Sequence, residues 1–227
     1  MRSFVVSTFL TLDGVMQAPG GPEEDPTGGF VHGGWSVNYW DDLMGQYMDE
    51  LIAKPFDLLL GRKTYEIFAA HWPHVTGDPM AAALNRATKY VVTTTLDKAE
   101  WRDSILIRPG GPGERDVPKQ IRRLKEQDGP EIQVHGSGEL IQTLLKHDLV
   151  DRYRLMIFPV LLGSGRRLFA DGTGPAGLRV VDSKISTTGV IMATYERAGG
   201  INYGSFALEE PTEAEVERRR RLTDGAG

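Results

Sequence analysis

The feature that most constrains the fold is an alternation of short apolar stretches with longer amphipathic ones. Short runs rich in Leu, Val, Ile and Thr, typical of strands, occupy 3–10, 56–61, 89–95, 104–108 and 131–136. Apolar residues at helical spacing predict helices over 41–53, 62–70, 79–87, 117–127 and 138–147. Strands that alternate with helices in this way predict an α/β fold with a mostly parallel sheet.

The C-terminal third changes character. The stretch 152–163 reads as a strand that runs into a glycine turn, and 178–197 and 201–209 read as antiparallel strands. We therefore expect a central mixed, mostly parallel sheet flanked by helices, with antiparallel C-terminal strands, in one domain over residues 1–208. The charged remainder, 209–227, is predicted to be a flexible, solvated tail.

Charge and composition narrow the class of partner. The formal net charge of −5 disfavours a nucleic-acid partner, which more often meets a basic surplus. The absence of cysteine excludes disulfides, thiolate metal sites and a cysteine nucleophile, and the histidines are too scattered to predict a metal. No apolar run approaches the roughly 20 residues that span a bilayer, and no signal peptide is evident, so we expect a cytoplasmic protein without a membrane partner.

Three predicted strand-to-helix or strand-to-loop junctions carry small or hydroxylated residues where a phosphate is readily held. They are Gly61, Arg62, Lys63 and Thr64; Thr93, Thr94 and Thr95; and Gly136, Ser137, Gly138 and Glu139. Free N–H groups and the helix dipole attract anions at such places, although each junction alone also suits an ordinary turn. Hydroxyls rather than an acid after the strand at 89–95 favour a 2′-phosphate, and hence NADP over NAD.

The order of four motifs resembles the dihydrofolate reductase-like superfamily, and within it the branch related to the reductase domain of riboflavin biosynthesis. The motifs are "LTLDGVM", "LLGRKTYE", "GSGEL" and "FPVLLGSGRRLF", spread over most of residues 1–208. The resemblance implies NADPH binding, hydride transfer to a small-molecule substrate and a homodimer. It implies that the three junctions hold the cofactor's phosphates and adenosine, and that Asp13, Gly14, Leu162, Gly163 and Ser164 border the nicotinamide.

The chain also departs from this pattern. Dihydrofolate reductases usually have adjacent glycines at the third junction, whereas Ser137 intervenes here, so we expect no strained Gly–Gly peptide. The riboflavin branch usually has a small residue where Arg62 stands, which weighs against that branch's substrate.

Candidate catalytic acids and substrate contacts lie near the first motif and beyond it. Asp13 and Asp42 are the candidate proton donors, with Asp41 as the alternative to Asp42; Asp13 equally suits a turn acid, and the other two suit a helix N-terminus. Trp35, Trp40 and Trp72 are candidate substrate-binding residues. The loop 17–40, whose first part, 17–36, is rich in Gly and Pro, is expected to shape the pocket.

These features predict an NADPH-dependent oxidoreductase that transfers hydride to a small heterocyclic or carbonyl substrate. Two alternatives stay open. The first is a pterin or riboflavin-pathway pyrimidine reductase, and the second is a nucleotide-binding sensor module without catalysis.

Overall fold

An eight-stranded sheet forms the centre of the protein, as the computed structural model of residues 1–110 and 116–224 shows. The strands lie in the order β4-β3-β2-β5-β1-β6-β8-β7. They are β1 (Phe4–Thr11), β2 (Phe56–Gly61), β3 (Lys89–Val92), β4 (Ser104–Ile107), β5 (Glu131–Gly136), β6 (Arg152–Phe158), β7 (Leu178–Ile185) and β8 (Ile191–Arg197). The six strands β1 to β6 pair in parallel with one another, whereas β8 pairs antiparallel with β6 and β7. The predicted fold class is confirmed.

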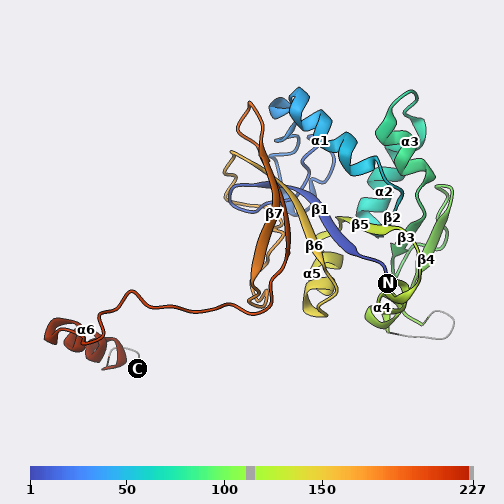
Figure 1. Cartoon of the computed structure of the whole chain (residues 1–227). Helices are drawn as coiled ribbons and strands as arrows, with labels where there is room; N and C mark the ends of the chain where they lie inside the picture. Colours follow the sequence, from blue (N-terminus) through green and yellow to red (C-terminus); the bar gives the residue numbers. More distant parts are fainter. Residues whose placement is uncertain (111–115, 225–227) are drawn as a thin grey trace.

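Helices cover both faces of this sheet. They are α1 (Asp42–Ile52), α2 (Arg62–His71), α3 (Pro79–Arg86), α4 (Val117–Glu126) and α5 (Gly138–Lys146), with 3-10 turns at Thr27–Gly29, Val37–Tyr39 and Trp72–His74. Strand β2 shows why both faces are buried, since Leu58 and Leu60 pack with α2 and α3, while Leu59 packs with α4 and α5. In Figure 1, α1, α2 and α3 accordingly lie on one side of the sheet, and α4 and α5 on the other.

The helices differ in how they begin. Three have an aspartate cap: Asp41, Asp78 and Asp116 accept a backbone N–H bond at the starts of α1, α3 and α4. The residues before α2 and α5, Gly61 and Ser137, make no side-chain cap hydrogen bond. The first N–H groups of these two helices are therefore left for another acceptor.

Two strands are shorter than the sequence predicts. Strand β3 stops at Val92 because the Thr93 hydroxyl accepts hydrogen bonds from the amides of Thr95 and Leu96 and turns the chain. Strand β6 stops at Phe158, where Pro159 follows and has no N–H to continue the ladder. The predictions of strands to residues 95 and 163 were wrong at these ends.

The prediction of a strand over 201–209 was wrong. The segment is irregular and exposed, with Phe206 fully in solvent, because no neighbouring strand offers it backbone partners in the described structure. Beyond it, α6 (Glu213–Asp224) is a helix without buried residues that lies away from the sheet in Figure 1. Ion pairs of Glu215 and Glu217 with the following arginines stabilise this helix. Residues 225–227 of the predicted flexible tail lie outside the described residues.

Within residues 1–110 and 116–224, no helix has the length and apolar character needed to cross a membrane. The same residues contain no group of three or more His, Asp or Glu side chains arranged to hold a metal ion.

Candidate active site

The segments that follow the parallel strands meet at one edge of the sheet. Because β3, β2, β5, β1 and β6 are neighbours and run in parallel, their carboxyl ends lie side by side. In that spatial order, the segments are 93–95, 61–64, 136–139, 13–14 and 159–163. The fold therefore brings the three predicted phosphate junctions and the first motif to one place, as open α/β sheets do for their ligands.

The junctions after β2 and β5 are in direct contact. Leu60 is paired with Gly136, and a Cβ at Gly61 would stand 2.9 Å from the Ser137 nitrogen and clash with its hydroxyl. A Cβ at Gly136 would stand 2.5 Å from the Thr64 hydroxyl. Both glycines are thus required for the two uncapped helices to begin next to each other.

The peptide bond between Gly136 and Ser137 is cis. From the sequence we expect no strained Gly–Gly peptide here, and nothing in it anticipates a cis bond that involves the intervening serine. The sequence argument considered only a Gly–Gly bond, whereas the structure has the bond between Gly136 and the intervening serine.

The charged and hydroxylated residues of the junctions have partners of different kinds. Arg62 forms an exposed ion pair with Glu66, one turn along α2, and the Lys63 ammonium donates to the Thr27 hydroxyl at 3.3 Å. Thr93 is buried in the turn after β3, while Thr94 and Thr95 are exposed. Gly138 and the exposed Glu139 open α5.

Asp13 fastens the loop after β6 to the end of β1. Its carboxylate accepts hydrogen bonds from the Thr11 hydroxyl at 2.5 Å and from the amides of Leu162 and Gly163 at 3.3 and 2.8 Å. The Thr11 hydroxyl, with these amides, holds the pKa of Asp13 below its usual value. Asp13 is therefore an ionised acceptor that holds Leu162 and Gly163 beside Gly14, with the exposed Ser164 next along the loop.

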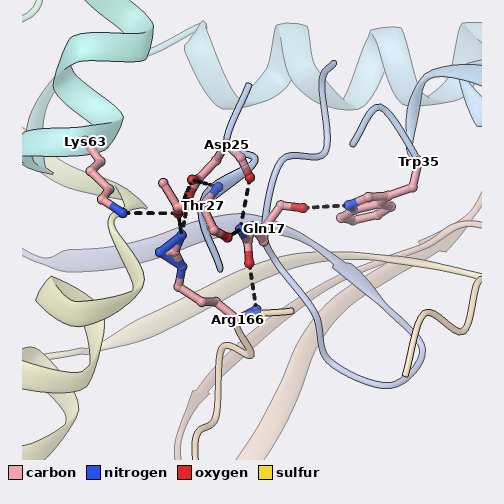
Figure 2. Close-up of polar contacts among 6 residues, drawn as sticks. All are labelled: Gln17, Asp25, Thr27, Trp35, Lys63 and Arg166. Atoms are coloured by element: carbon pink, nitrogen blue, oxygen red, sulfur yellow. Dashed lines mark hydrogen bonds and ion pairs between the residues drawn. The ribbon is translucent and has the colours of Figure 1, made fainter. Parts of the chain in front are cut away.

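A polar cluster fastens the loop 17–36 over this edge (Figure 2). The Gln17 amide donates to the carbonyls of Asp25 and Thr27 and accepts from the Arg166 amide. The Arg166 guanidinium forms a 2.7 Å ion pair with Asp25 and also donates to the Thr27 hydroxyl, which Lys63 contacts from α2. The loop is thus joined to both α2 and the loop after β6.

A pocket of about 1000 Å³ opens between this loop, β1 and helices α1, α2 and α3. Its lining comprises residues Ser7, Thr8, Phe9, Pro19, Gly20, Gly21, Pro22, Glu23, Glu24, Trp40, Gly45, Met48, Asp49, Thr64, Ile67, Phe68, His71, Trp72, Asp78, Pro79, Met80, Leu84 and His135. Thr64 belongs both to this lining and to the β2 junction, so the pocket adjoins the two uncapped helices.

The three candidate tryptophans lie in different surroundings, and only two of them line the pocket. Trp40 and Trp72 line the pocket, and Trp40 packs edge-to-face on Phe9. Trp35 does not line it: its side chain is buried, donates to the Gln17 carbonyl at 2.8 Å and packs on Phe158. The buried Trp35 side chain therefore stabilises the loop 17–36, to which it belongs, by joining it to Phe158.

The candidate acids of α1 also lie outside the pocket lining. Asp41 caps the helix and accepts hydrogen bonds from the amide and hydroxyl of Thr187, which hold the pKa of Asp41 below its usual value. Asp42 is exposed in the first turn, on the same helical face as Gly45 and Asp49, which do line the pocket.

Two pocket residues with shifted pKa values were not among the candidates of the sequence analysis. Glu24 accepts a hydrogen bond from the Gly20 amide at 2.5 Å, and burial raises the pKa of Glu24 above its usual value. His135 contacts the Gln133 side chain at 3.2 Å, and burial lowers the pKa of His135 to about 4, so its imidazole is neutral at pH 7. The position of Glu24 in the predicted substrate loop was the available signal; for His135 it was the end of a predicted strand.

Comparisons with known proteins agree with this architecture. The model of the family described as RibD C-terminal domain matches residues 2–192. The uncharacterized protein YyaP of Bacillus subtilis (strain 168) is 26% identical over 207 residues, which cover 87% of this chain and 96% of that protein.

Two solved structures share the fold at low identity. Dihydrofolate reductase from Enterococcus faecalis, complexed with NADP(H) and RAB-propyl, is 14% identical with a TM-score of 0.54, over 86% of this chain and 96% of that one. The diaminohydroxyphosphoribosylaminopyrimidine deaminase/5-amino-6-(5-phosphoribosylamino)uracil reductase of Thermotoga maritima is 15% identical with a TM-score of 0.57. That match covers 87% of this chain and 57% of the longer Thermotoga protein.

Proposed function

The chain belongs to the RibD C-terminal domain family, and from this premise we propose that it is an NADPH-dependent reductase of a small heterocyclic or carbonyl substrate. The observation that carries the proposal is the pair of uncapped helices, α2 and α5, which begin in contact beside an aromatic pocket. Paired helix N-termini suit a pyrophosphate, and the adjoining pocket suits a substrate ring.

The residues at the sheet edge fit a dinucleotide cofactor. Gly61 and Gly136 leave room for each other's junction, and the hydroxyls of Ser137 and Thr64 occupy the space beside them. In this proposal the first amides of α5, from Gly138 and Glu139, hold the pyrophosphate. The exposed hydroxyls of Thr94 and Thr95, with Arg62 and Lys63 on the next junction, hold the 2′-phosphate. The Enterococcus reductase of the same fold is complexed with NADP(H), which supports this choice of cofactor.

When bound, NADPH supplies the hydride, and the chain supplies position and a proton. We assign the proton to Glu24, the half-buried pocket carboxyl whose pKa is raised and which therefore keeps its proton to higher pH than an ordinary glutamate. Asp13 takes the orienting role, since its low pKa keeps it ionised and its hydrogen bonds position Leu162 and Gly163. Catalysis by Asp42 stays a prediction.

The proposal is tested by NADPH oxidation, followed at 340 nm, with a panel of pyrimidines, pteridines, flavins and carbonyl compounds. We expect turnover with at least one class, above the rate without acceptor. Tight NADPH binding without turnover across the panel would instead favour the sensor module. The riboflavin-pathway alternative is favoured by the family match and by the name of the Thermotoga reductase.

We also propose that two copies of the chain associate through β7. This strand is one of the two edge strands of the sheet, and Val180, Val181 and Ile185 on it are 55%, 46% and 66% exposed. A free edge with apolar side chains is a surface that pairing with a second copy covers. Sedimentation equilibrium should give twice the mass of one chain, reduced by Val181→Lys; a wild-type mass of one chain would contradict the homodimer. The cytoplasmic location stays a prediction.

A further inference from the structure

Four carboxyl side chains line the pocket. Glu23, Glu24, Asp49 and Asp78 line it from the loop 17–36, α1 and the start of α3. Among the described residues that line the pocket there is no lysine or arginine. Of the four carboxyls, Glu23, Asp49 and Asp78 belong to exposed residues at the rim, so their charge faces whatever enters.

Arg154, Lys63 and Arg166 do not line the pocket and contact other side chains. Arg154 lies close enough to His135 to lower the pKa of its imidazole, but its guanidinium is held by both carboxylate oxygens of Glu131 behind the pocket. Lys63 and Arg166 contact Thr27, on the side of the loop that faces α2 and the loop after β6 (Figure 2). The site is thus divided into a basic side at the helix N-termini and an acidic side in the pocket.

The walls of the pocket are aromatic. Phe9, Trp40, Phe68 and Trp72 line it from β1, the segment before α1, α2 and the turn after α2. His135 lies against the Phe68 ring at 5.9 Å between ring centroids and is neutral at pH 7. Such walls favour a planar ring, and a neutral imidazole adds a hydrogen-bonding group without adding positive charge.

We infer that the pocket takes an aromatic heterocycle that carries no phosphate, neutral or positively charged. A phosphate of charge near −2 meets the three exposed carboxylates and no lysine or arginine there, whereas a neutral ring keeps the aromatic contacts. This inference rests on the proposed function and narrows it. It separates this chain from the Thermotoga protein, whose name describes a phosphoribosylamino substrate.

The test uses two probes with the same ring, riboflavin and its 5′-phosphate, FMN, each titrated into the protein at low ionic strength by flavin fluorescence. We expect riboflavin to bind about tenfold more tightly than FMN, the size of effect that a few partly screened charge repulsions produce. Added salt should narrow the difference because it screens the carboxylates.

A matched set of variants tests whether the preference for riboflavin over FMN arises from the carboxyls of the pocket. The double variant Glu23→Gln/Asp49→Asn should tighten FMN binding severalfold and leave riboflavin binding unchanged. Glu100→Gln is the control, since Glu100 is exposed and pairs with Lys98 away from the pocket. An unchanged FMN affinity in the double variant would overturn the inference.

Two other outcomes would also overturn it. One is FMN binding as tightly as riboflavin, and the other is the failure of both probes to bind at millimolar concentration. Either result leaves the proposed function standing if NADPH binds and is oxidised, whereas loss of NADPH binding contradicts the proposed function itself. The two failures are therefore distinguishable.

Discussion

Replacing Gly61 by alanine is expected to weaken NADPH binding by about 100-fold or more. The new Cβ would stand 2.9 Å from the Ser137 nitrogen and 3.0 Å from its Cβ, where real Cβ atoms are not found. The start of α2 must then move away from the start of α5, and the loss of hydrogen bonds to a charged phosphate, worth about 1.5–3 kcal/mol each, accounts for about 100-fold in affinity. The same overpacking should lower the free energy of unfolding by about 1–3 kcal/mol. Titration calorimetry with NADPH measures the first effect, and urea denaturation the second.

The matched control is Gly174→Ala, because a Cβ at Gly174 meets nothing within 4 Å. It should bind NADPH like the wild type and unfold at nearly the same urea concentration. Wild-type NADPH affinity in Gly61→Ala would show that the contact between the two junctions does not form the cofactor site.

The second large effect is expected at Glu24. Glu24→Gln should lower the rate of NADPH oxidation with the best acceptor by about 100-fold, because the amide keeps an oxygen for the Gly20 hydrogen bond but has no proton to give. The affinity for NADPH should stay within about twofold, since the carboxyl lies in the pocket and not at the helix N-termini.

The pH dependence separates this role from a structural one. Burial raises the pKa of Glu24, so the protonated, active form is lost as pH rises through that raised value. The wild-type rate should therefore fall as the pH rises through this value, whereas the residual rate of Glu24→Gln should stay constant over the same pH range. If Glu24→Gln keeps the wild-type rate and the same decrease of that rate with rising pH, Glu24 is excluded as the proton donor.

The sequence was sufficient where a local pattern decides the structure. The run 56–61 is apolar and ends in glycine, and the structure has β2 over those residues. The predicted strand at 201–209 has similar side chains, but no neighbouring strand pairs with it in the described structure. Strand pairing depends on residues far away in the sequence, so a local pattern does not predict it. The threonines after Val92 have high β propensity, yet the Thr93 hydroxyl binds two backbone amides and ends the strand.

The sequence predicted which junctions form the candidate site, but it did not predict how their residues contact one another. Parallel strands place 61–64, 93–95 and 136–139 at one edge, as their position after predicted strands implied. The contact between Gly61 and Ser137 depends on the pairing of β2 with β5, which no local pattern specifies. Glu24 was missed because its raised pKa arises from burial by a loop whose path the Gln17 and Arg166 contacts determine. Trp35 was chosen by residue type, and its burial depends on that same path.

The central claim is that this edge of the sheet holds NADPH, with its pyrophosphate at the paired helix N-termini and its 2′-phosphate at the neighbouring threonine junction. It is tested most directly by titrating the protein with NADPH and with NADH while following tryptophan emission. Trp40 and Trp72 line the adjoining pocket, so a bound nicotinamide should quench their emission. The account predicts quenching by both nucleotides with NADPH bound at least about tenfold more tightly, because charge-assisted hydrogen bonds to the 2′-phosphate are lost in NADH. Equal affinity for the two nucleotides, or no binding of either, would contradict it.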